Sequence, residues 1–523
     1  MTTSSASRPQ ATDLHALLRE LAQQSPDAVA AVDRSFDLHM TYSQLLQRSG
    51  KLAAAWHHWG VQPGSRVVWL GQNSARVLEG ILACAQLGAI FCPLNWRQTT
   101  AELEFVLQDL EPALVIWQQQ EIGGELESLH TAFNSPAQRW VQHDGDASEY
   151  EASLQENHPA PPERAVEPGA AVLMLYTAAF AGKPNGAVLS HRAVMAQSDA
   201  FATIRDIGTD ATYLNVGPLF HVATLLETMA TFQAGACNVF IRRADAQAIC
   251  EAIEQEGCTS AFLLPPIIEQ IIDYSKKQTV NITSLCTLAG SPDWNALITV
   301  DESLWGRFPY GFGQTETFGY ASYRALAPDG IGSMGKASPA VEIGIFDNGG
   351  TALAAGEVGE IGVHGATVLN EYWRRPSLNE QRRLGDWHLC NDLGRLEADG
   401  TLTFIGPKER MIRSGQENIY PAEVELCLRA HPALAAAAVI GVPDPKWDQS
   451  VKAIVVLAEG ADADAEENTA AGIIGYCKQH IASYKKPKQV VFVDALPKTG
   501  NAIDYAALDR DFGGGGYPGG DRR

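Results

Sequence analysis

The sequence predicts an α/β protein with a large N-terminal domain of sheets layered with helices and a small α+β C-terminal domain. Its 523 residues are too many for a single hydrophobic core, so two or more domains are expected. Up to about residue 410, helical apolar spacing alternates with short apolar runs, which is typical of layered α/β folds. Beyond about residue 410 a new and shorter set of predicted helices and strands begins, which indicates the small C-terminal domain.

The first elements follow from local patterns. Apolar residues at helical spacing predict a helix over 14–22, and the runs 66–70 and 113–117 have the length and composition of buried strands. Residues 141–168 are polar and rich in proline, which predicts a loop. The apolar run 171–175 predicts a strand, followed by a Gly/Pro loop and a helix beginning near His191.

The smaller C-terminal unit has its own sequence of elements. A helix is expected over 421–429, and strands are expected over 436–441 and 451–457. Residues 1–12 and the glycine-rich segment 513–520 are expected to be flexible tails.

Composition excludes several classes of function. A formal net charge of −22 argues against non-specific nucleic-acid binding and against docking on an anionic membrane. The nine cysteines are scattered singly without a CxxC pair, so neither structural zinc nor a disulfide framework is expected. The sequence shows no signal peptide and no apolar run of the ~20 residues that a transmembrane helix needs. The expected location is the cytoplasm.

The most informative motif is the segment YTAAFAGKPNG over 176–186. A loop that grips a triphosphate uses small residues so that backbone N–H groups approach the ligand, together with hydroxyl groups and a lysine. Here Gly182 and Gly186 keep the turn, but Phe180 adds bulk and Asn185 is neutral. The frame of a phosphate loop is therefore present, whereas most of its ligand-binding atoms are missing.

This segment resembles the signature loop of the acyl-adenylate-forming superfamily, which reads roughly YTSGTTGxPKG and includes acyl-CoA synthetases, adenylation domains of peptide synthetases and luciferases. Further matches lie in family order from about residue 10 to about residue 510. They are GPLFH at 217–221, FGQTE at 312–316, GSMGK at 332–336, GEVGEI at 356–361, NDLGR at 391–395, SGQENIYP at 414–421, YKKPK at 484–488 and PKTG at 497–500.

The resemblance implies a two-step reaction and the domains that perform it. A carboxylate attacks the α-phosphate of ATP to give an acyl-adenylate and pyrophosphate, and a thiol then displaces AMP. The implied cofactors are ATP, Mg²⁺ and coenzyme A, the implied substrate is a small carboxylic acid, and a homodimer is the suggested assembly. Residues 1–408 would hold the acyl and nucleotide pockets, 409–510 would form a mobile lid that swings about a hinge at Glu409, and 511–523 would form a flexible tail.

The resemblance also assigns roles to individual residues. Thr315 and Glu316 would contact the α-phosphate, with Glu316 as the Mg²⁺ ligand, and a hard cation of this kind prefers oxygen donors. Asp392 would accept hydrogen bonds from the ribose hydroxyls, and His221 would border the acyl pocket. The remaining nucleotide contacts would come from Thr177, Gly182, Lys183, Gly186, Gly290, Gly313, Gln314 and Arg395. Lys183 is the candidate for a replacement cation in the loop.

Several positions depart from the family pattern, among them Ala178, Phe180, Asn185, Pro407 and Asn501. Asn185 and Asn501 stand where the family has lysines, and Pro407 stands where it has an arginine. Losing one preorganised donor commonly lowers a rate on the order of 10²–10³-fold. Two functions therefore stay open, an ATP-dependent acyl-CoA ligase with altered phosphate contacts and a non-adenylating member of the fold. The second would bind acyl-CoA or a nucleotide, act as a regulatory partner, or perform only the thiol-side chemistry.

Overall fold

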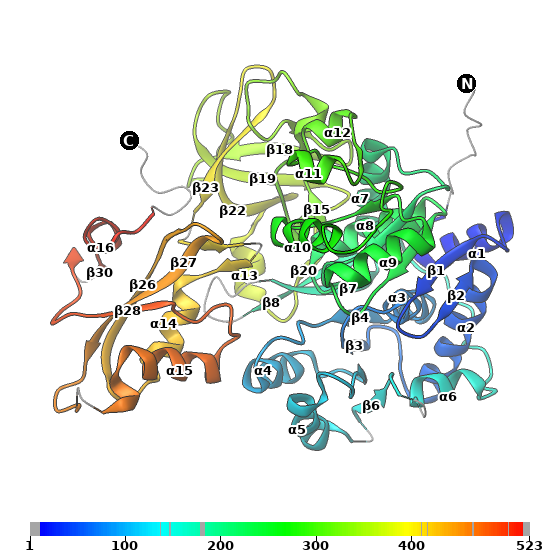
Figure 1. Ribbon diagram of the computed structural model, residues 1–523, viewed down its shortest axis with the longest axis horizontal. Coiled ribbons are helices and arrows are strands. Elements are labelled where there is room, and N and C mark those ends of the chain that lie inside the picture. The colour runs from blue at the N-terminus through cyan, green and yellow to red at the C-terminus, as the bar shows by residue number, and fades with distance from the viewer. Residues whose placement is uncertain are drawn as a thin grey trace.

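The computed structural model describes residues 11–135, 137–145, 148–177, 184–408, 410–415, 417–462, 465–499 and 502–515. A large mixed α/β N-terminal part is followed by a smaller C-terminal α+β part, which projects from one side of the molecule (Figure 1). This is the fold class that the sequence predicts.

The largest sheet forms the base of the N-terminal part. Its seven strands are ordered β20-β8-β7-β4-β3-β5-β6, with parallel pairing from β7 to β6 and antiparallel pairing at β7-β8 and β8-β20. Alternate residues of β3 face opposite cores, because Val67 packs with α1 to α3 while Val68 packs with α4 and α5. The strands are β3 (Arg66–Leu70), β4 (Ile90–Pro93), β5 (Leu114–Trp117), β6 (Arg139–Gln142), β7 (Ala171–Thr177), β8 (Asn185–Ser190) and β20 (Glu371–Tyr372).

Helices cover both faces of this sheet and separate it from a second sheet. The second sheet is ordered β11-β9-β10-β1-β2 and is parallel except at β1-β2. Its strands are β1 (Val29–Asp33), β2 (Leu38–Thr41), β9 (Thr212–Asn215), β10 (Cys237–Phe240) and β11 (Ser260–Ala261). The helices are α1 (Leu14–Gln24), α2 (Tyr42–His58), α3 (Ala75–Leu87), α4 (Thr100–Leu110), α5 (Gly123–Phe133), α6 (Glu149–Gln155), α7 (His191–Arg205), α8 (Val222–Gln233), α9 (Ala246–Glu256) and α10 (Pro265–Ser275).

A third, antiparallel sheet completes the N-terminal part. It is ordered β18-β19-β22-β21, and β23 also pairs with β22. Its strands are β18 (Val341–Phe346), β19 (Gly359–Gly365), β21 (Arg383–Leu384), β22 (Trp387–Leu396) and β23 (Leu402–Pro407). Short elements connect the sheets: β12 (Cys286–Thr287), α11 (Pro292–Asn295), β13 (Thr299–Val300), α12 (Leu304–Arg307), β14 (Gly313–Gln314), η1 (Thr315–Thr317), β15 (Gly319–Tyr320), β16 (Ser322–Tyr323), η2 (Arg324–Leu326), β17 (Lys336–Ala337) and α13 (Pro376–Gln381).

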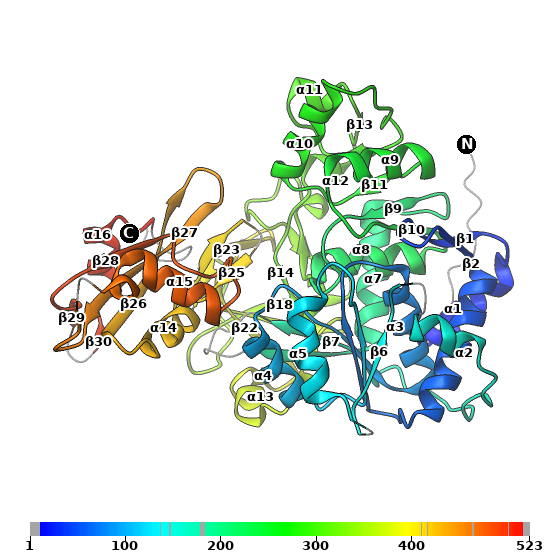
Figure 2. The same cartoon turned by 60° about the horizontal axis from the view of Figure 1, so that its bottom comes forward.

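The C-terminal part is built on a sheet of its own, ordered β25-β24-β27-β26 with β28 beside β27. Apolar clusters fill both faces of this sheet, so the unit has an independent core. In two views α14 and α15 lie beside α4 of the N-terminal part (Figure 1, Figure 2). The elements are β24 (Ile412–Ser414), β25 (Glu417–Ile419), α14 (Pro421–Arg429), β26 (Leu434–Asp444), β27 (Asp448–Leu457), η3 (Glu466–Asn468), α15 (Ala470–His480), β28 (Gln489–Phe492), β29 (Lys498–Thr499), β30 (Ala502–Ile503) and α16 (Tyr505–Phe512).

Three local predictions are corrected by the structure. The phosphate loop does not lead directly into a helix, since β8 follows it and pairs antiparallel with β7 before α7 begins at His191. The predicted loop over 141–168 contains α6, whose side-chain cap comes from Ser148. The predicted tail over 511–523 begins too early, because Phe512 ends α16 and the Gly515 N–H donates to the Gly441 carbonyl at 3.0 Å.

Candidate functional site

A cavity of about 140 Å³ lies between the N-terminal and C-terminal parts. Three of the predicted site residues, Thr177, His221 and Thr315, line it together. Thr177 ends β7, Thr315 begins η1, and His221 is the N-cap residue of α8. Segments far apart in the sequence therefore meet at one hollow, where the C-terminal part contributes Glu417 and Lys485 to the wall.

Glu316 sits in the tight turn between β14 and β15. At Gly313 a Cβ atom would lie 2.4 Å from the Gly319 carbonyl oxygen, so only glycine allows the two strands to approach so closely. The Glu316 side chain is buried, and the Tyr372 hydroxyl donates a hydrogen bond to its Oε1 at 2.9 Å. Burial raises the pKa of Glu316, whereas the bond from Tyr372 lowers it.

Asp392 lies on β22 close enough to Glu316 for the two carboxylates to repel each other. Burial and repulsion from Glu316 together raise the pKa of Asp392 to about 7, although Arg382 opposes the rise. The preceding residue, Asn391, has φ +63°, a left-handed conformation that asparagine tolerates better than most residues. The structure thus brings together the two carboxylates that the sequence singled out, and it gives Asp392 a proton that titrates near neutrality.

The raised pKa of Asp392 predicts how stability depends on pH. The folded-state pKa of about 7 lies above the ordinary value of 3.8, so between these values the folded protein binds more protons than the unfolded chain. The stabilising contribution is present below about pH 4 and is lost as the pH rises through about 7. In thermal unfolding, Asp392→Asn should therefore gain stability relative to the wild type between about pH 5 and about pH 8. A difference in melting temperature that does not change with pH would contradict this assignment.

Other predicted site residues have more varied surroundings. The Gln314 side chain donates a hydrogen bond to the Cys390 thiol, which opposes the rise that burial causes in the Cys390 pKa. His221 Nδ1 accepts from the Ala223 N–H at 3.2 Å, and burial lowers the His221 pKa, which favours the neutral ring. Gly290 lies in an exposed turn where its N–H donates to Asn295 Oδ1 at 2.8 Å. No contact links this turn to the cavity in the part of the chain described.

Arg395 does not join the carboxylate cluster. Its guanidinium is 40% exposed and donates to Glu397 Oε1 at 2.7 Å. The register of β22 shifts between Leu393 and Gly394, which interrupts regular alternation after Asp392. A nucleotide contact from Arg395 therefore stays a prediction.

A cation that the sequence analysis missed lies beside Asn185. Arg375 Nε donates to Asn185 Oδ1 at 3.2 Å, and its two Nη atoms bind both oxygens of Asp109 at 2.9 and 3.0 Å. The Tyr176 hydroxyl also donates to Asp109, at 2.8 Å. One ionic network therefore ties both ends of the loop motif, and Asn185 accepts a hydrogen bond where the family has a lysine. Sequence gave no signal for this, since Arg375 is 190 residues away from Asn185.

Two further cations lie near Asp392. Pro407 is directly opposite Asp392 in the β22-β23 register, so the missing arginine position is adjacent to the predicted ribose ligand. The next residue, Lys408, binds Glu360 at 2.7 Å, and Arg382 approaches the other oxygen of Glu360 at 3.5 Å. Positive charge is thus present near Asp392, but Lys408 and Arg382 supply it instead of residue 407.

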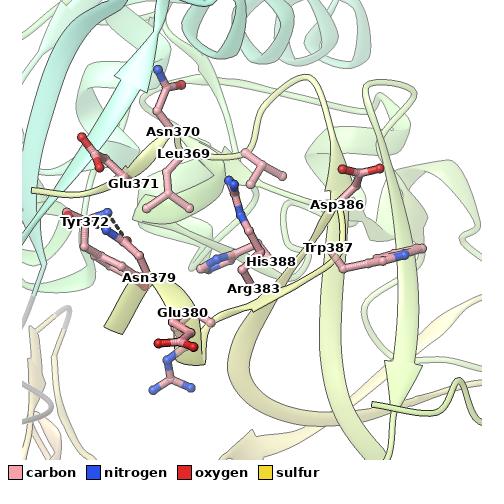
Figure 3. A pocket seen from close by; sticks show the side chains of 12 residues that line it. Leu369, Asn370, Glu371, Tyr372, Asn379, Glu380, Arg383, Asp386, Trp387 and His388 are labelled. Atoms are coloured by element: carbon pink, nitrogen blue, oxygen red, sulfur yellow. Dashed lines mark hydrogen bonds between the residues drawn. The ribbon is translucent and has the colours of Figure 1, made fainter. Parts of the chain in front are cut away.

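A second cavity, of about 270 Å³, adjoins Glu316 through Tyr372 (Figure 3). Figure 3 shows His388 between Tyr372 and Trp387, and Asn379 bonded to the Tyr372 backbone. The buried His388 Nε2 atom has no hydrogen-bond partner among the described residues, and burial lowers the pKa of His388 to about 3. This ring is therefore neutral, and its centroid lies 6.1 Å from that of the Tyr372 ring.

Several predicted positions lie outside the described residues. They are Ala178, Phe180, Gly182, Lys183, Glu409 and Asn501. Gly186, by contrast, lies in β8, where a Cβ atom would meet Met174 Sδ at 2.7 Å. Within the described ranges no three His, Cys, Asp or Glu side chains are grouped to hold a metal ion, and no helix has the length and apolar character needed to cross a membrane.

Comparisons with known proteins match nearly the whole chain. The profile of the AMP-binding enzyme family matches residues 18–373, and that of the AMP-binding enzyme C-terminal domain matches residues 423–502. Feruloyl-CoA synthase from an Amycolatopsis species is 33% identical over 500 residues, which cover 94% of this chain and 97% of the relative. Indoleacetate–CoA ligase from Aromatoleum aromaticum is 34% identical over 474 residues, which cover 88% and 90%.

Solved structures of o-succinylbenzoate-CoA synthetase from Bacillus subtilis match at 25% identity in two complexes. The double mutant bound to its product analogue gives a TM-score of 0.77 and covers 94% of this chain and 97% of that chain. The complex with the acyl-adenylate intermediate has the same identity and coverage but a TM-score of 0.62. Because identity and coverage are equal, the whole chain superposes better on the product-analogue complex than on the acyl-adenylate complex.

Proposed function

Because the chain belongs to the AMP-binding enzyme family, we propose that it is an AMP-forming ligase joining a carboxylic acid to the thiol of coenzyme A. The observation that carries this proposal is the pairing of Glu316 with Asp392 beside the cavity lined by Thr177, His221 and Thr315. A buried carboxylate pair next to hydroxyl groups suits a ligand with phosphates, a cation and ribose hydroxyls.

The chemistry follows from what each residue can donate or accept. Above about pH 7 the ionised Asp392 accepts hydrogen bonds from the two ribose hydroxyls of ATP. The Thr315 hydroxyl lines the cavity and can donate a hydrogen bond toward the phosphates, and Tyr372 holds Glu316 in place. The Thr177 hydroxyl lines the same cavity and donates to the Asn185 carbonyl at 3.3 Å. A Mg²⁺ ion would be held by Glu316 together with phosphate oxygens and would neutralise charge at the α-phosphate. A single protein carboxylate fits this ion, which commonly uses one or two carboxylates plus substrate phosphates.

We propose an aromatic carboxylic acid as the substrate. The relatives at 33% and 34% identity are named for ferulate and indoleacetate, both of which carry an aromatic ring. Phe220, His221 and Val222 line the cavity and offer an apolar wall on which an aromatic ring can pack. Phe318 is fully buried and Tyr320 packs between Phe201 and Trp305, so these two residues belong to the core.

A second function, thiol-side chemistry without adenylation, is favoured by a specific observation. The cations around the predicted phosphate site are engaged by carboxylates: Arg375 by Asp109, Lys408 by Glu360, and Lys485 by Glu102 and Glu423. A paired cation stabilises developing phosphate charge less than a free one does. The whole chain also superposes on the product-analogue complex of the relative at a TM-score of 0.77.

Two assays separate these functions. Pyrophosphate release with ATP, Mg²⁺, coenzyme A and a panel of aromatic and aliphatic acids tests the complete reaction, with heat-inactivated protein as control. Thioester formation from a synthetic acyl-adenylate and coenzyme A tests the second step alone. We expect both activities, with aromatic acids preferred. Thioester formation without pyrophosphate release would support the second function, and absence of both would overturn both proposals.

Restoring the family lysines tests whether the altered loop limits the first step. Asn185→Lys combined with Asn501→Lys should raise the rate of pyrophosphate release on the order of 10²-fold, because each change adds a charged donor. Asn185→Gln combined with Asn501→Gln is the matched control, since it lengthens the side chains without adding charge. An equal rate in wild type, Lys and Gln proteins would show that the departures do not limit adenylation.

A further inference from the structure

A buried lysine ties the two parts of the molecule together. Lys485 follows α15 in the C-terminal part, and its Nζ atom donates to Glu102 Oε1 of α4 at 2.8 Å and to Glu423 Oε1 of α14. The exposed fractions of the three side chains are 7%, 14% and 8%. A charge removed from water to this extent needs partners, because an unpaired buried charge costs several kcal/mol.

The two glutamates that bind Lys485 belong to different parts of the molecule. Glu423 belongs to the same part as Lys485, so their ion pair persists wherever that part moves. Glu102 belongs to the N-terminal part, so its bond to Lys485 exists only while the two parts are docked as observed. The Lys485–Glu102 pair is therefore specific to this arrangement.

Hydrogen bonds at the start of α4 fix the Glu102 side chain in position for this contact. It is the third residue of α4, and its Oε2 accepts from the Thr99 N–H at 2.9 Å and from the Thr99 hydroxyl at 3.0 Å in a capping box. The other oxygen, Oε1, is left to accept from Lys485. Fixing one oxygen lowers the conformational entropy lost when the second bond forms.

The surrounding interface is loosely packed. A mainly apolar cavity of about 310 Å³ lies between α4 and helices α14 and α15, lined by Phe105 and Leu426 among others. A second polar contact joins Thr99 Oγ1 to the His480 carbonyl at 3.4 Å. The Lys485–Glu102 ion pair and this hydrogen bond are therefore polar contacts that join α4 to the C-terminal part beside an unfilled space.

We propose that Lys485 is a positioning residue that latches the C-terminal part onto Glu102 in the arrangement used for thiol transfer. This inference rests on the proposed function. Lys485 and Glu423 line the cavity that also holds Thr177, His221 and Thr315, so the latch fixes the wall facing the reacting groups. The whole chain superposes better on the product-analogue complex of the relative, at a TM-score of 0.77, than on its acyl-adenylate complex, at 0.62. Releasing the latch frees the C-terminal part to leave this arrangement.

Glu102→Gln is the most direct test. Glutamine keeps the capping box but removes the charge that Lys485 binds. Using a preformed acyl-adenylate and coenzyme A, we expect thioester formation to slow about tenfold, since removing one partner of a buried pair loosens the docked state. Pyrophosphate release should change less than threefold, roughly, because the first step does not use this docking.

Hydrogen exchange gives a readout that does not depend on activity. In Glu102→Gln, backbone amides over 480–486 and at the start of α4 should exchange faster, whereas those of the core strands β26 and β27 should not change. Glu104→Gln is the matched control, because Glu104 is exposed to solvent and accepts a hydrogen bond from Gln108 within α4 itself. Lys486→Met controls for the lysine, since Lys486 bonds Ser483 within its own turn.

The outcomes distinguish this inference from the proposed function. If the wild type forms no thioester, the proposed function fails and hydrogen exchange alone decides on the latch. Equal exchange in Glu102→Gln and Glu104→Gln overturns the latch, as does equal slowing of both half-reactions. Lys485→Met should reproduce Glu102→Gln and also lower the melting temperature, because it leaves Glu423 buried without its cation.

Discussion

Replacing Glu316 by glutamine is expected to lower pyrophosphate release on the order of 10²–10³-fold, the range found when one preorganised electrostatic group is removed. Glutamine has nearly the same shape and still accepts a hydrogen bond from Tyr372, but it lacks the negative charge that a cation needs. Stabilisation by Mg²⁺-ATP should fall as well. A ligand at 100 times its Kd adds about 2.7 kcal/mol, so its loss is readily seen in a thermal shift.

Glu371→Gln provides the control for this change. Glu371 is an exposed carboxylate on β20, next to Tyr372 in sequence, so its loss alters net charge equally without touching the pair of Glu316 and Asp392. Its activity should match that of the wild type. If both variants keep full activity and full Mg²⁺-ATP stabilisation, the cation is held elsewhere and the site is wrongly assigned.

Replacing Arg375 by alanine is expected to lower the free energy of unfolding by about 2–4 kcal/mol. The change leaves the carboxylate of Asp109, which is 10% exposed, without its bidentate partner, and it removes the donor to Asn185. This loss in the free energy of unfolding is set slightly lower than that for a fully buried ion pair, because the Arg375 side chain is 24% exposed. The measurement is the melting temperature of the N-terminal part, followed together with activity.

Arg374→Ala is a closely matched control. This neighbouring arginine pairs with Glu111 at the surface, where the two side chains are 46% and 61% exposed. Exposed pairs contribute about 0–1 kcal/mol, so the melting temperature should change little. Equal destabilisation by both alanine variants would show that the network of Arg375, Asp109, Tyr176 and Asn185 has no special role in holding the loop ends.

Much of the fold could be predicted because strong local patterns coincide with tertiary burial. The runs at β3 and at α14 have the observed bounds, since each is limited by turn or proline signals in the sequence. The strand β8 was missed because its sequence, NGAVLS, has only three consecutive apolar residues and begins inside the loop motif, so no strand pattern stands out. Pairing with β7 decides the outcome, and pairing is a long-range property.

Residues of the candidate site could be predicted only where they belong to a sequence motif. Glu316, Asp392, Thr177, Thr315 and His221 were identified by motifs, and the structure places them around one region. The cations were not predictable, because an arginine acquires its role from the carboxylate it meets in space. Arg375 meets Asp109 across 266 positions of sequence, and Lys485 meets Glu102 across 383.

The antiparallel pairing of β7 with β8 has a consequence for how this protein tolerates change. Thr177 lies opposite Asn185 in the ladder, so main-chain pairing fixes the two residues that flank the centre of the loop motif. Substitutions at positions between Thr177 and Asn185 leave the pairing of β7 with β8 in place. Ligand binding and folding stability therefore depend on different positions of this segment. We expect substitutions between the two strands to change binding more than the free energy of unfolding.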